Sequence, residues 1–199
     1  MDKVALLGSA DGRIVKALVK YFEGKDVTFV CLSDNEHSDF LEKANELGIE
    51  VKYLPHEKNF EYFSSHDFSL VALCDYRQHV QDDVLKTGKF ISIHASLLPS
   101  FKGPDAMHRA FNSGVKVSGV TVHWVTEDVD GGKIIAQYPV LIGNLTHFDE
   151  YEAEIYAVEN MLYPVVIDKL LKDEVFDFSD LMNSGGCGNS CGGCGGCAK

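Results

Sequence analysis

Short apolar runs alternate with amphipathic segments through the first half of the chain, and this alternation constrains the fold more than any other feature. The run Leu70–Cys74 is apolar at every position, so neither face of a strand built from it is suited to water. Strand-like runs at Val4–Leu7 and Val27–Leu32 precede it, and amphipathic stretches at Ile14–Phe22 and Phe40–Leu47 lie between the runs. Strands that are covered on both faces and alternate with helices are typical of a parallel sheet. We therefore expect an α/β fold with an open, doubly wound, mostly parallel sheet.

The second half has a different pattern. Residues Val115–Val125 form a long, partly alternating run, and Ile134–Ile142 follows after a short loop, so the two predict an antiparallel pair of strands. Phe148–Leu171 has a broad apolar face at helical spacing and predicts a helix packed on the sheet. From residue 183 onward the chain is rich in glycine and cysteine. We expect one domain at residues 1–182 and a flexible tail at 183–199.

Charge and hydrophobicity exclude several classes of protein. Thirty acidic against eighteen basic residues give a net charge of -12, which would repel the phosphate backbone of a nucleic acid. No stretch approaches the length of a membrane span, and the apolar run at the N-terminus is too short for a signal peptide. We expect a cytoplasmic protein that binds neither nucleic acid nor membrane. Cys31 and Cys74 lie in apolar runs and are predicted to be small buried side chains.

A glycine-containing loop, Gly8–Gly12, follows the first predicted strand and opens the first helix. Free backbone N–H groups at such a position bind phosphate in many open α/β sheets. The loop has neither a dinucleotide-binding G-x-G-x-x-G pattern nor a nucleoside triphosphate-binding Walker pattern. Two interpretations stay open, a phosphate site of another kind or a simple turn. Arg13 is either a charged donor at such a site or a solvated surface residue.

Three blocks of sequence carry the strongest functional signal. Residues 92–103 read SIHASLLPSFKG, residues 117–137 contain VSGVTVHWV and DVDGGKIIAQ, and residues 157–164 read AVENMLYP. In order and spacing they resemble the signatures of the folate-dependent formyltransferases, the family typified by glycinamide ribonucleotide formyltransferase. The resemblance covers roughly residues 3–172. It implies a Rossmann-like formyltransferase fold and the transfer of a formyl group from 10-formyltetrahydrofolate to an amine, with glycinamide ribonucleotide or a related small amine as acceptor.

The chemistry of formyl transfer explains the residue types in these blocks. When an amine attacks the formyl carbon, the tetrahedral centre carries an oxyanion and an ammonium group together. A histidine can stabilise the oxygen or shuttle the proton, and a neighbouring aspartate can hold the ring and accept the ammonium proton. The resemblance assigns these roles to His94 and Asp130, and both are expected at the same edge of the sheet. His123 also matches a family position, but a half-buried structural histidine is an equally good interpretation.

The remaining site residues follow from the resemblance alone. The predicted contacts to folate are Tyr76, Arg77, His79, Val125, Val129 and Gly131. The predicted contacts to the acceptor are Gly12, Arg13, Ser96, Pro99, Gly103 and Glu159. The expected partners are folate and a small-molecule amine, and the protein is expected to be a monomer or a homodimer.

The chain departs from the family pattern at three places. Ser92 stands where the family carries an asparagine whose amide reaches the oxyanion, and the loss of such a donor costs about 3 kcal/mol, a hundredfold or more in rate. The folate-facing segment becomes residues 74–80, CDYRQHV, and the phosphate-binding Gly-Ser-Asn of the first loop becomes Gly12-Arg13-Ile14. An alternative therefore stays open, a weak or inactive homologue that binds folate, another metabolite or a metal.

Four cysteines lie close together near the C-terminus. Their spacing would let all four sulfur atoms face one centre, and four thiolates suit Zn²⁺ or an iron–sulfur cluster. The predicted ligands are Cys187, Cys191, Cys194 and Cys197. The alternative is a redox-sensitive or accessory tail, because ordering so many glycines is entropically unfavourable.

Overall fold

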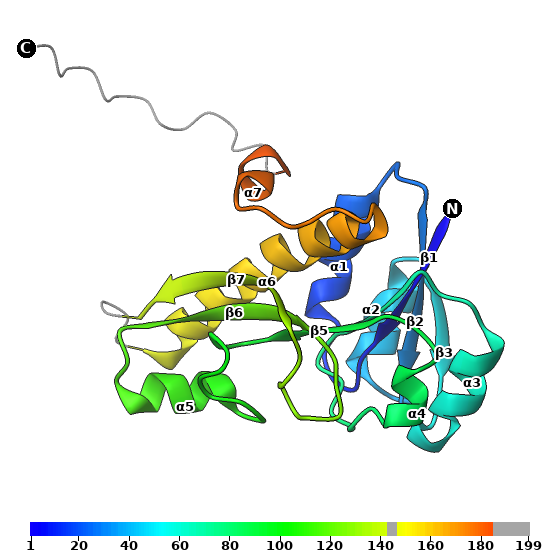
Figure 1. Cartoon of the computed structure of the whole chain (residues 1–199), viewed down its shortest axis with the longest axis horizontal. Helices are drawn as coiled ribbons and strands as arrows, with labels where there is room; N and C mark the ends of the chain where they lie inside the picture. The colour runs from blue at the N-terminus through cyan, green and yellow to red at the C-terminus, as the bar shows by residue number, and fades with distance from the viewer. Residues whose placement is uncertain (143–146, 185–199) are drawn as a thin grey trace, which may run out of the picture.

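The computed structural model describes residues 1–142 and 147–184, which form a seven-stranded sheet covered by helices (Figure 1). The strands are β1 (Asp2–Leu7), β2 (Val27–Ser33), β3 (Glu50–Tyr53), β4 (Leu70–Leu73), β5 (Phe90–His94), β6 (Val117–Trp124) and β7 (Ile134–Leu141). The helices are α1 (Arg13–Phe22), α2 (Asp39–Glu46), the 3-10 turn η1 (His56–Lys58), α3 (Asn59–Ser65), α4 (Asp82–Leu85), α5 (Ala106–Ser113), α6 (Phe148–Leu171) and α7 (Ser179–Ser184).

The order of the strands in the sheet is β3-β2-β1-β4-β5-β6-β7. The first five strands run parallel, whereas β6 is antiparallel to both β5 and β7. This arrangement confirms the predicted α/β fold with a mostly parallel sheet and an antiparallel pair in the second half. The chain leaves β1 toward β2 on one side and returns to β4 on the other, so the strand order reverses between β1 and β4. Ligands of open α/β sheets bind at such a switch point, beyond the carboxyl ends of the strands.

Two apolar layers sandwich the sheet because successive side chains of a strand point to opposite faces. On β1, Val4 and Leu6 belong to the core cluster beneath α1, α2 and α6. Ala5 and Leu7 belong to the opposite cluster, which contains buried side chains of α3 and α4. Helix α6 runs along the β6–β7 hairpin and also contacts α1 (Figure 1). The sheet is therefore covered on both faces, as the apolar run at residues 70–74 indicated.

Helix α6 is fixed to the centre of the sheet by a buried tyrosine. The hydroxyl of Tyr163 donates to the carbonyl of Leu73 at the end of β4, with an O···O distance of 2.9 Å. On the same helix, Asp168 accepts from Lys25 and from Lys172 and so ties α6 to the end of α1. The Tyr163 contact holds α6 at the carboxyl end of β4, and the Asp168 contact with Lys25 holds it near the amino end of β2.

Several short helices were not predicted from the sequence. Helices α3 and α4 have seven residues or fewer, too few turns for a clear amphipathic pattern. Helix α5 has eight residues, as the predicted α2 does, but it lacks the side-chain cap that Ser38 gives to α2. Helix α7 crosses the predicted domain boundary at residue 182, and Leu181 packs into the main core while Asp180 pairs with Lys169 at 2.9 Å. The four tail cysteines lie outside the described residues. Within the described residues, no helix is both long and apolar enough to span a membrane.

Candidate active site

A cleft with a volume of about 840 Å³ opens at the carboxyl ends of β1, β4 and β5. The first loop, the segment after β4 and the end of β5 form its floor, and the loops before α5 and after β6 form one wall. Tyr156 and Glu159 of α6 close the other side. The cleft therefore lies at the switch point of the sheet, where an open α/β fold binds its ligands.

Polar side chains collect on one face of β5 and β6 because of strand alternation and register. Ser92 and His94 are two residues apart on β5, so they point to the same face. Across the antiparallel pair, Ser92 lies opposite His123, and His94 lies opposite Thr121. Residues that are directly opposite share a face of the sheet. This register brings Ser92, His94 and His123 together on the cleft.

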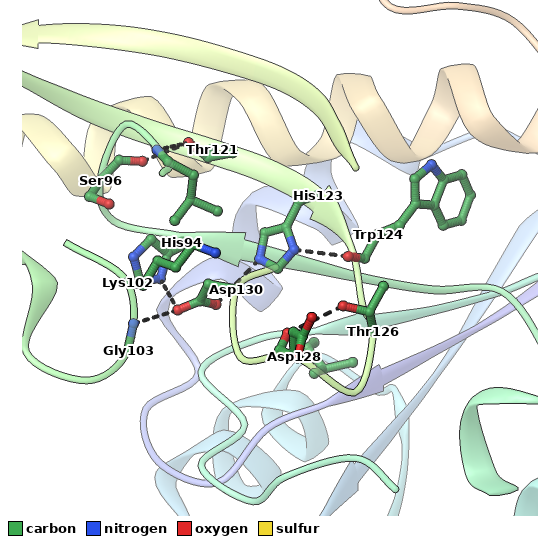
Figure 2. A network of polar contacts seen from close by, with 12 residues as sticks. His94, Ser96, Lys102, Gly103, Thr121, His123, Trp124, Thr126, Asp128 and Asp130 are labelled. Carbon is green, nitrogen blue, oxygen red and sulfur yellow. Dashed lines mark hydrogen bonds and ion pairs between the residues drawn. The ribbon is translucent and has the colours of Figure 1, made fainter. Parts of the chain in front are cut away.

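Asp130 lies between the two histidines (Figure 2). Its Oδ2 is 3.4 Å from Nδ1 of His94, and its Oδ1 is 3.5 Å from Nε2 of His123. The backbone N–H of Gly103 donates to Oδ2 at 2.7 Å. Nε2 of His94 lies 3.1 Å from the carbonyl of Phe101, and Nδ1 of His123 lies 2.9 Å from the carbonyl of Trp124 (Figure 2). One carboxylate is thus held by two imidazole rings and a backbone N–H.

These contacts set the protonation of the site. Burial alone would raise the pKa of Asp130, but the interactions with His123, the Gly103 N–H and His94 lower it to about 2, so the group is a carboxylate at neutral pH. Burial lowers the pKa of His94 in spite of the opposing charge of Asp130. Both nitrogen atoms of His94 face acceptors, and a neutral ring satisfies only one of them. Burial favours the neutral ring and the two acceptors favour the charged one, a balance that suits a proton-transfer group.

The loop that carries Asp130 is tightly folded. Asp130 has φ of 49°, in the left-handed region that few side chains adopt. A Cβ on Gly131 would lie 2.6 Å from Cβ of Asp128, and a Cβ on Gly132 would lie 1.7 Å from the carbonyl oxygen of Trp124. Only glycine fits these positions, so the Gly-Gly pair of the sequence motif sets the path of the chain past the carboxylate.

A second loop, residues 97–105, supports the site from the other side. Thr121 accepts from the N–H of Leu98 and donates to the carbonyl of Ser96 at 2.6 Å. Ser96 is fully buried and donates to the carbonyl of Ser100, so its hydroxyl shapes the loop. Ser96 and Pro99, both predicted to contact the acceptor, lie outside the cleft lining, whereas Gly103 is part of it.

Arg109 binds the same loop and was missed by the sequence analysis. Its guanidinium donates to the carbonyls of Phe101, Lys102, Gly103 and Pro104. The carbonyl of Phe101 is also the acceptor beside His94, and the N–H of Gly103 is a donor to Asp130. Arg109 therefore positions both loop contacts of the candidate catalytic pair. Contacts to main-chain carbonyls leave no signature in the sequence, so no signal in the chain could have found it.

At the end of the cleft beside α1, Arg13 and Glu159 both line the wall. Arg13 bonds to Asp11, and its guanidinium carbon lies 3.3 Å from the ring centroid of Tyr156. Glu159 is half-buried, and burial raises its pKa to about 7. Gly12, predicted to contact the acceptor, is buried at the start of α1 and does not line the cleft.

The opposite end of the cleft contains most of the predicted folate contacts. Tyr76, His79, Val125 and Val129 line it, Arg77 lines the cleft beside Asp75, and Gly131 is not part of the lining. The hydroxyl of Tyr76 accepts from Asn59 at 3.0 Å and lies 3.0 Å from Nδ1 of His56, which fixes the ring. This end therefore combines an aromatic ring and two valines with polar groups.

Among the described residues, no three histidine, cysteine or acidic side chains are arranged to hold a metal ion. Cys31 and Cys74 are buried and unpaired, and burial raises the pKa of Cys31 to about 12, so the thiol stays protonated. The predicted ligands Cys187, Cys191, Cys194 and Cys197 lie outside the described residues.

Comparison with known proteins gives a consistent group of relatives. Residues 2–167 match the family described as Formyl transferase. The chain is 35% identical over 188 residues to "Phosphoribosylglycinamide formyltransferase" of Bacillus subtilis (strain 168), covering 86% of this chain and 95% of that protein. It is 35% identical over 178 residues to "Formyltetrahydrofolate deformylase 2, mitochondrial" of Arabidopsis thaliana, covering 80% of this chain and 52% of that protein. The crystal structure of glycinamide ribonucleotide transformylase 1 from Symbiobacterium toebii superposes with a TM-score of 0.80 at 28% identity, covering 87% of this chain and 89% of that chain.

Proposed function

This chain belongs to the formyl transferase family, and from that premise we propose that it transfers a formyl group from 10-formyltetrahydrofolate to the primary amine of a small molecule. The observation that carries the proposal is the contact of His94 with Asp130, whose Nδ1 and Oδ2 atoms are 3.4 Å apart in the cleft. Two of the three named relatives carry phosphoribosylglycinamide or glycinamide ribonucleotide in their names, so glycinamide ribonucleotide is the first acceptor to test.

In the proposed reaction the protein must stabilise the formyl oxygen and accept a proton from the attacking amine. Attack of the amine nitrogen on the formyl carbon forms a C–N bond and moves an electron pair onto the formyl oxygen. His94, which can carry or release a proton, stabilises that oxygen. Asp130 is ionised and accepts the proton that the attacking nitrogen loses, directly or through a water molecule. Collapse of the intermediate restores the C=O bond and breaks the bond between the formyl carbon and folate N10, which takes up the proton that Asp130 accepted from the amine.

Ser92 is proposed to lie beside the same oxygen. It lines the cleft on the face of the sheet that carries His94. No described residue forms a hydrogen bond with its hydroxyl, so this donor is available to a ligand. A serine is shorter than asparagine, and a bridging water would compensate for part of that difference.

The two ends of the cleft suggest how the substrates are arranged. Tyr76, Val125 and Val129 supply aromatic and apolar surface that suits the flat ring of the folate, and Arg77 and His79 add polar groups. Glu159, on the far side of the His94–Asp130 pair, supplies a carboxylate that suits an amine. The formyl group would then lie between the two ends.

The proposal is tested by incubating the chain with 10-formyltetrahydrofolate and glycinamide ribonucleotide or a panel of amino sugars. Released folate is followed by absorbance, and formate is measured in parallel. Amine-dependent release of folate without formate supports transfer. Formate without an amine product would show hydrolysis, the reaction in the name of the plant relative, and would contradict the proposal.

One observation favours a second function. The resemblance places asparagine at the position of Ser92, and a binding protein without turnover would tolerate its loss. The Ser92→Asn variant separates the two functions. An increase in formyl transfer of about tenfold or more marks an impaired enzyme, because one oxyanion donor is worth up to about a hundredfold. Folate binding with no gain in transfer favours the binding protein.

A further inference from the structure

Carboxylates dominate the end of the cleft beside α1. Asp11, Asp75 and Glu159 line this end together with Arg13. Arg77 lies near Asp75, with 3.7 Å between Nη2 and Oδ2, and its side chain is 68% exposed. The surroundings of a ligand here are therefore acidic, although a helix start in an open α/β sheet usually favours an anion.

Asp11 itself occupies the anion position at the start of α1. Its Oδ1 accepts from the backbone N–H of Arg13, the first residue of the helix, at 2.9 Å. The same oxygen accepts from Nε of Arg13 at 2.7 Å. The guanidinium also stacks on Tyr156 with 3.3 Å between its carbon and the ring centroid. The charge of Arg13 is thus matched by Asp11, and the side chain is held against α6.

Two neighbouring backbone N–H groups, those of Ser9 and Arg77, are also engaged. The N–H of Ser9 donates to the carbonyl of Asp75 at 3.3 Å, and the hydroxyl of Ser9 accepts from the N–H of Arg77 at 2.9 Å. These bonds join the first loop to the segment after β4, and with the bond from Arg13 to Asp11 they take up three N–H groups near the start of α1. A phosphate entering this end would have to displace Asp11 and would meet the negative charges of Asp75 and Glu159.

The environment of Glu159 indicates which ligand groups can bind at this end of the cleft. Its half-buried carboxylate faces the cleft and has no hydrogen bond or ion pair with any described residue. A partly buried carboxylate without a partner is matched by N–H and O–H donors or by a cation. Burial raises the pKa of Glu159 to about 7, and above that pH a ligand with such donors would satisfy the carboxylate, whereas a ligand anion would not.

We infer that the acceptor of this protein is a primary amine without a phosphate group, because Asp11 fills the position that a phosphate would take. The hydroxyl, amide or further amino groups of this acceptor donate to Glu159 and Asp75. This inference rests on the proposed function, since it concerns the acceptor of the same formyl transfer. It sets the chain apart from the relatives of Bacillus subtilis and Symbiobacterium toebii, whose names describe an acceptor that carries a phosphate.

A matched pair of ligands tests the inference: glycinamide ribonucleotide and the same molecule without its phosphate, glycinamide ribonucleoside. Their affinities for the full chain are measured by calorimetry. At about pH 8, where Glu159 is ionised, we expect the native chain to bind the ribonucleoside at least about tenfold more tightly, because a phosphate dianion would have to displace Asp11 and would approach the carboxylate of Glu159. In Asp11→Ala, which removes both the charge and the occupying oxygen, the preference shrinks or inverts. Asp11→Asn keeps the acceptor for the Arg13 N–H and separates the effect of charge from that of space.

The control is Glu23→Gln, which removes one negative charge at the exposed far end of α1 and leaves the ratio of the two affinities unchanged. Tighter binding of the ribonucleotide by the native chain would overturn the inference, as would a ratio unaffected by Asp11→Ala in a folded variant. Binding of neither molecule would also overturn it, because phosphate would then not be what the cleft discriminates. Turnover is measured separately with both ligands and 10-formyltetrahydrofolate. Absence of formyl transfer alongside a clear preference for the ribonucleoside contradicts the proposed enzyme and leaves the inference about phosphate standing.

Discussion

Glu159→Gln is expected to stabilise the protein at alkaline pH and to leave its stability at acid pH almost unchanged. Burial raises the pKa of Glu159 from its usual 4.5 to about 7; Asp11 and Asp75 act in the same direction, and Arg13 opposes them. In the unfolded chain the group ionises near 4.5, whereas the folded protein keeps its proton up to about pH 7. Between these values the folded state binds more protons, so the free energy of unfolding falls as the pH rises.

The size of this effect follows from the same pKa. A fall of about 1.4 kcal/mol per pH unit across the window gives at most about 3.5 kcal/mol. Solvent reaches part of the half-buried carboxyl group, which reduces the expected loss to about 2 kcal/mol. Glutamine has nearly the same shape and no charge, so it removes the loss. The difference in the free energy of unfolding between variant and native chain should be close to zero at about pH 5 and about 2 kcal/mol at about pH 8.

Urea unfolding at the two pH values measures this difference. Trp124, the one tryptophan of the chain, provides the fluorescence signal. Other titrating groups are shared by the two proteins and cancel in the difference. Glu154→Gln, at an exposed position on the same helix, is the control and should show a small difference that does not change with pH. Equal differences for Glu159→Gln at both pH values would refute the account of a desolvated carboxyl group in the cleft.

Three further changes test individual contacts. Arg109→Ala should lower kcat about tenfold and shift the pH profile of transfer, because the Phe101 carbonyl beside His94 loses its hydrogen bond from the guanidinium. Arg109→Lys should retain only part of the native kcat, because an ammonium group cannot bind four carbonyls at once. An unchanged pH profile would assign Arg109 a purely structural role. Gly132→Ala should lower the free energy of unfolding by about 2 kcal/mol and remove most of the activity, because its Cβ would lie 1.7 Å from the Trp124 carbonyl oxygen. Gly88→Ala, whose Cβ would have its nearest neighbour at 3.7 Å, should be tolerated. Urea unfolding compares the two variants, and equal losses of stability would contradict this explanation. Tyr163→Phe should lower the melting temperature by several degrees, since the carbonyl of Leu73 loses the buried hydroxyl donor, and no change would mean that this bond contributes nothing.

The central strands β1, β2 and β4 could be predicted from the sequence because they are largely buried on both faces. A continuous run such as Leu70–Cys74 has one physical interpretation in an α/β chain, and the structure places β4 at the centre of the sheet. The short helices could not be predicted in this way. Helix α5 has eight residues and begins after Asp105, which has a left-handed φ of 56° and makes no capping bond from its side chain. It lacks the start signal by which sequence analysis finds a helix.

Some residues of the candidate site could be predicted from the sequence, and others could not. His94 and Asp130 stood out because their motifs resemble a family signature, and the structure brings them within 3.4 Å. Ser96 belongs to the same motif, but its burial and its bond to Ser100 are tertiary facts that the motif does not contain. The bond between Asp11 and Arg13 was equally hidden, since the sequence shows two charges and not which ligand position they fill.

The most direct test of the proposed chemistry follows the formyl carbon itself. 10-Formyltetrahydrofolate labelled with ¹³C at the formyl group is mixed with the full chain and an amine panel that contains the ribonucleoside and ribonucleotide, and the label is followed by NMR. We expect the label to move from folate N10 to an amide of the acceptor in the native chain, with the rate reduced by about a hundredfold or more in His94→Ala and in Asp130→Asn. Label that remains on the folate with every amine, or that appears as formate, would contradict formyl transfer by the His94–Asp130 pair.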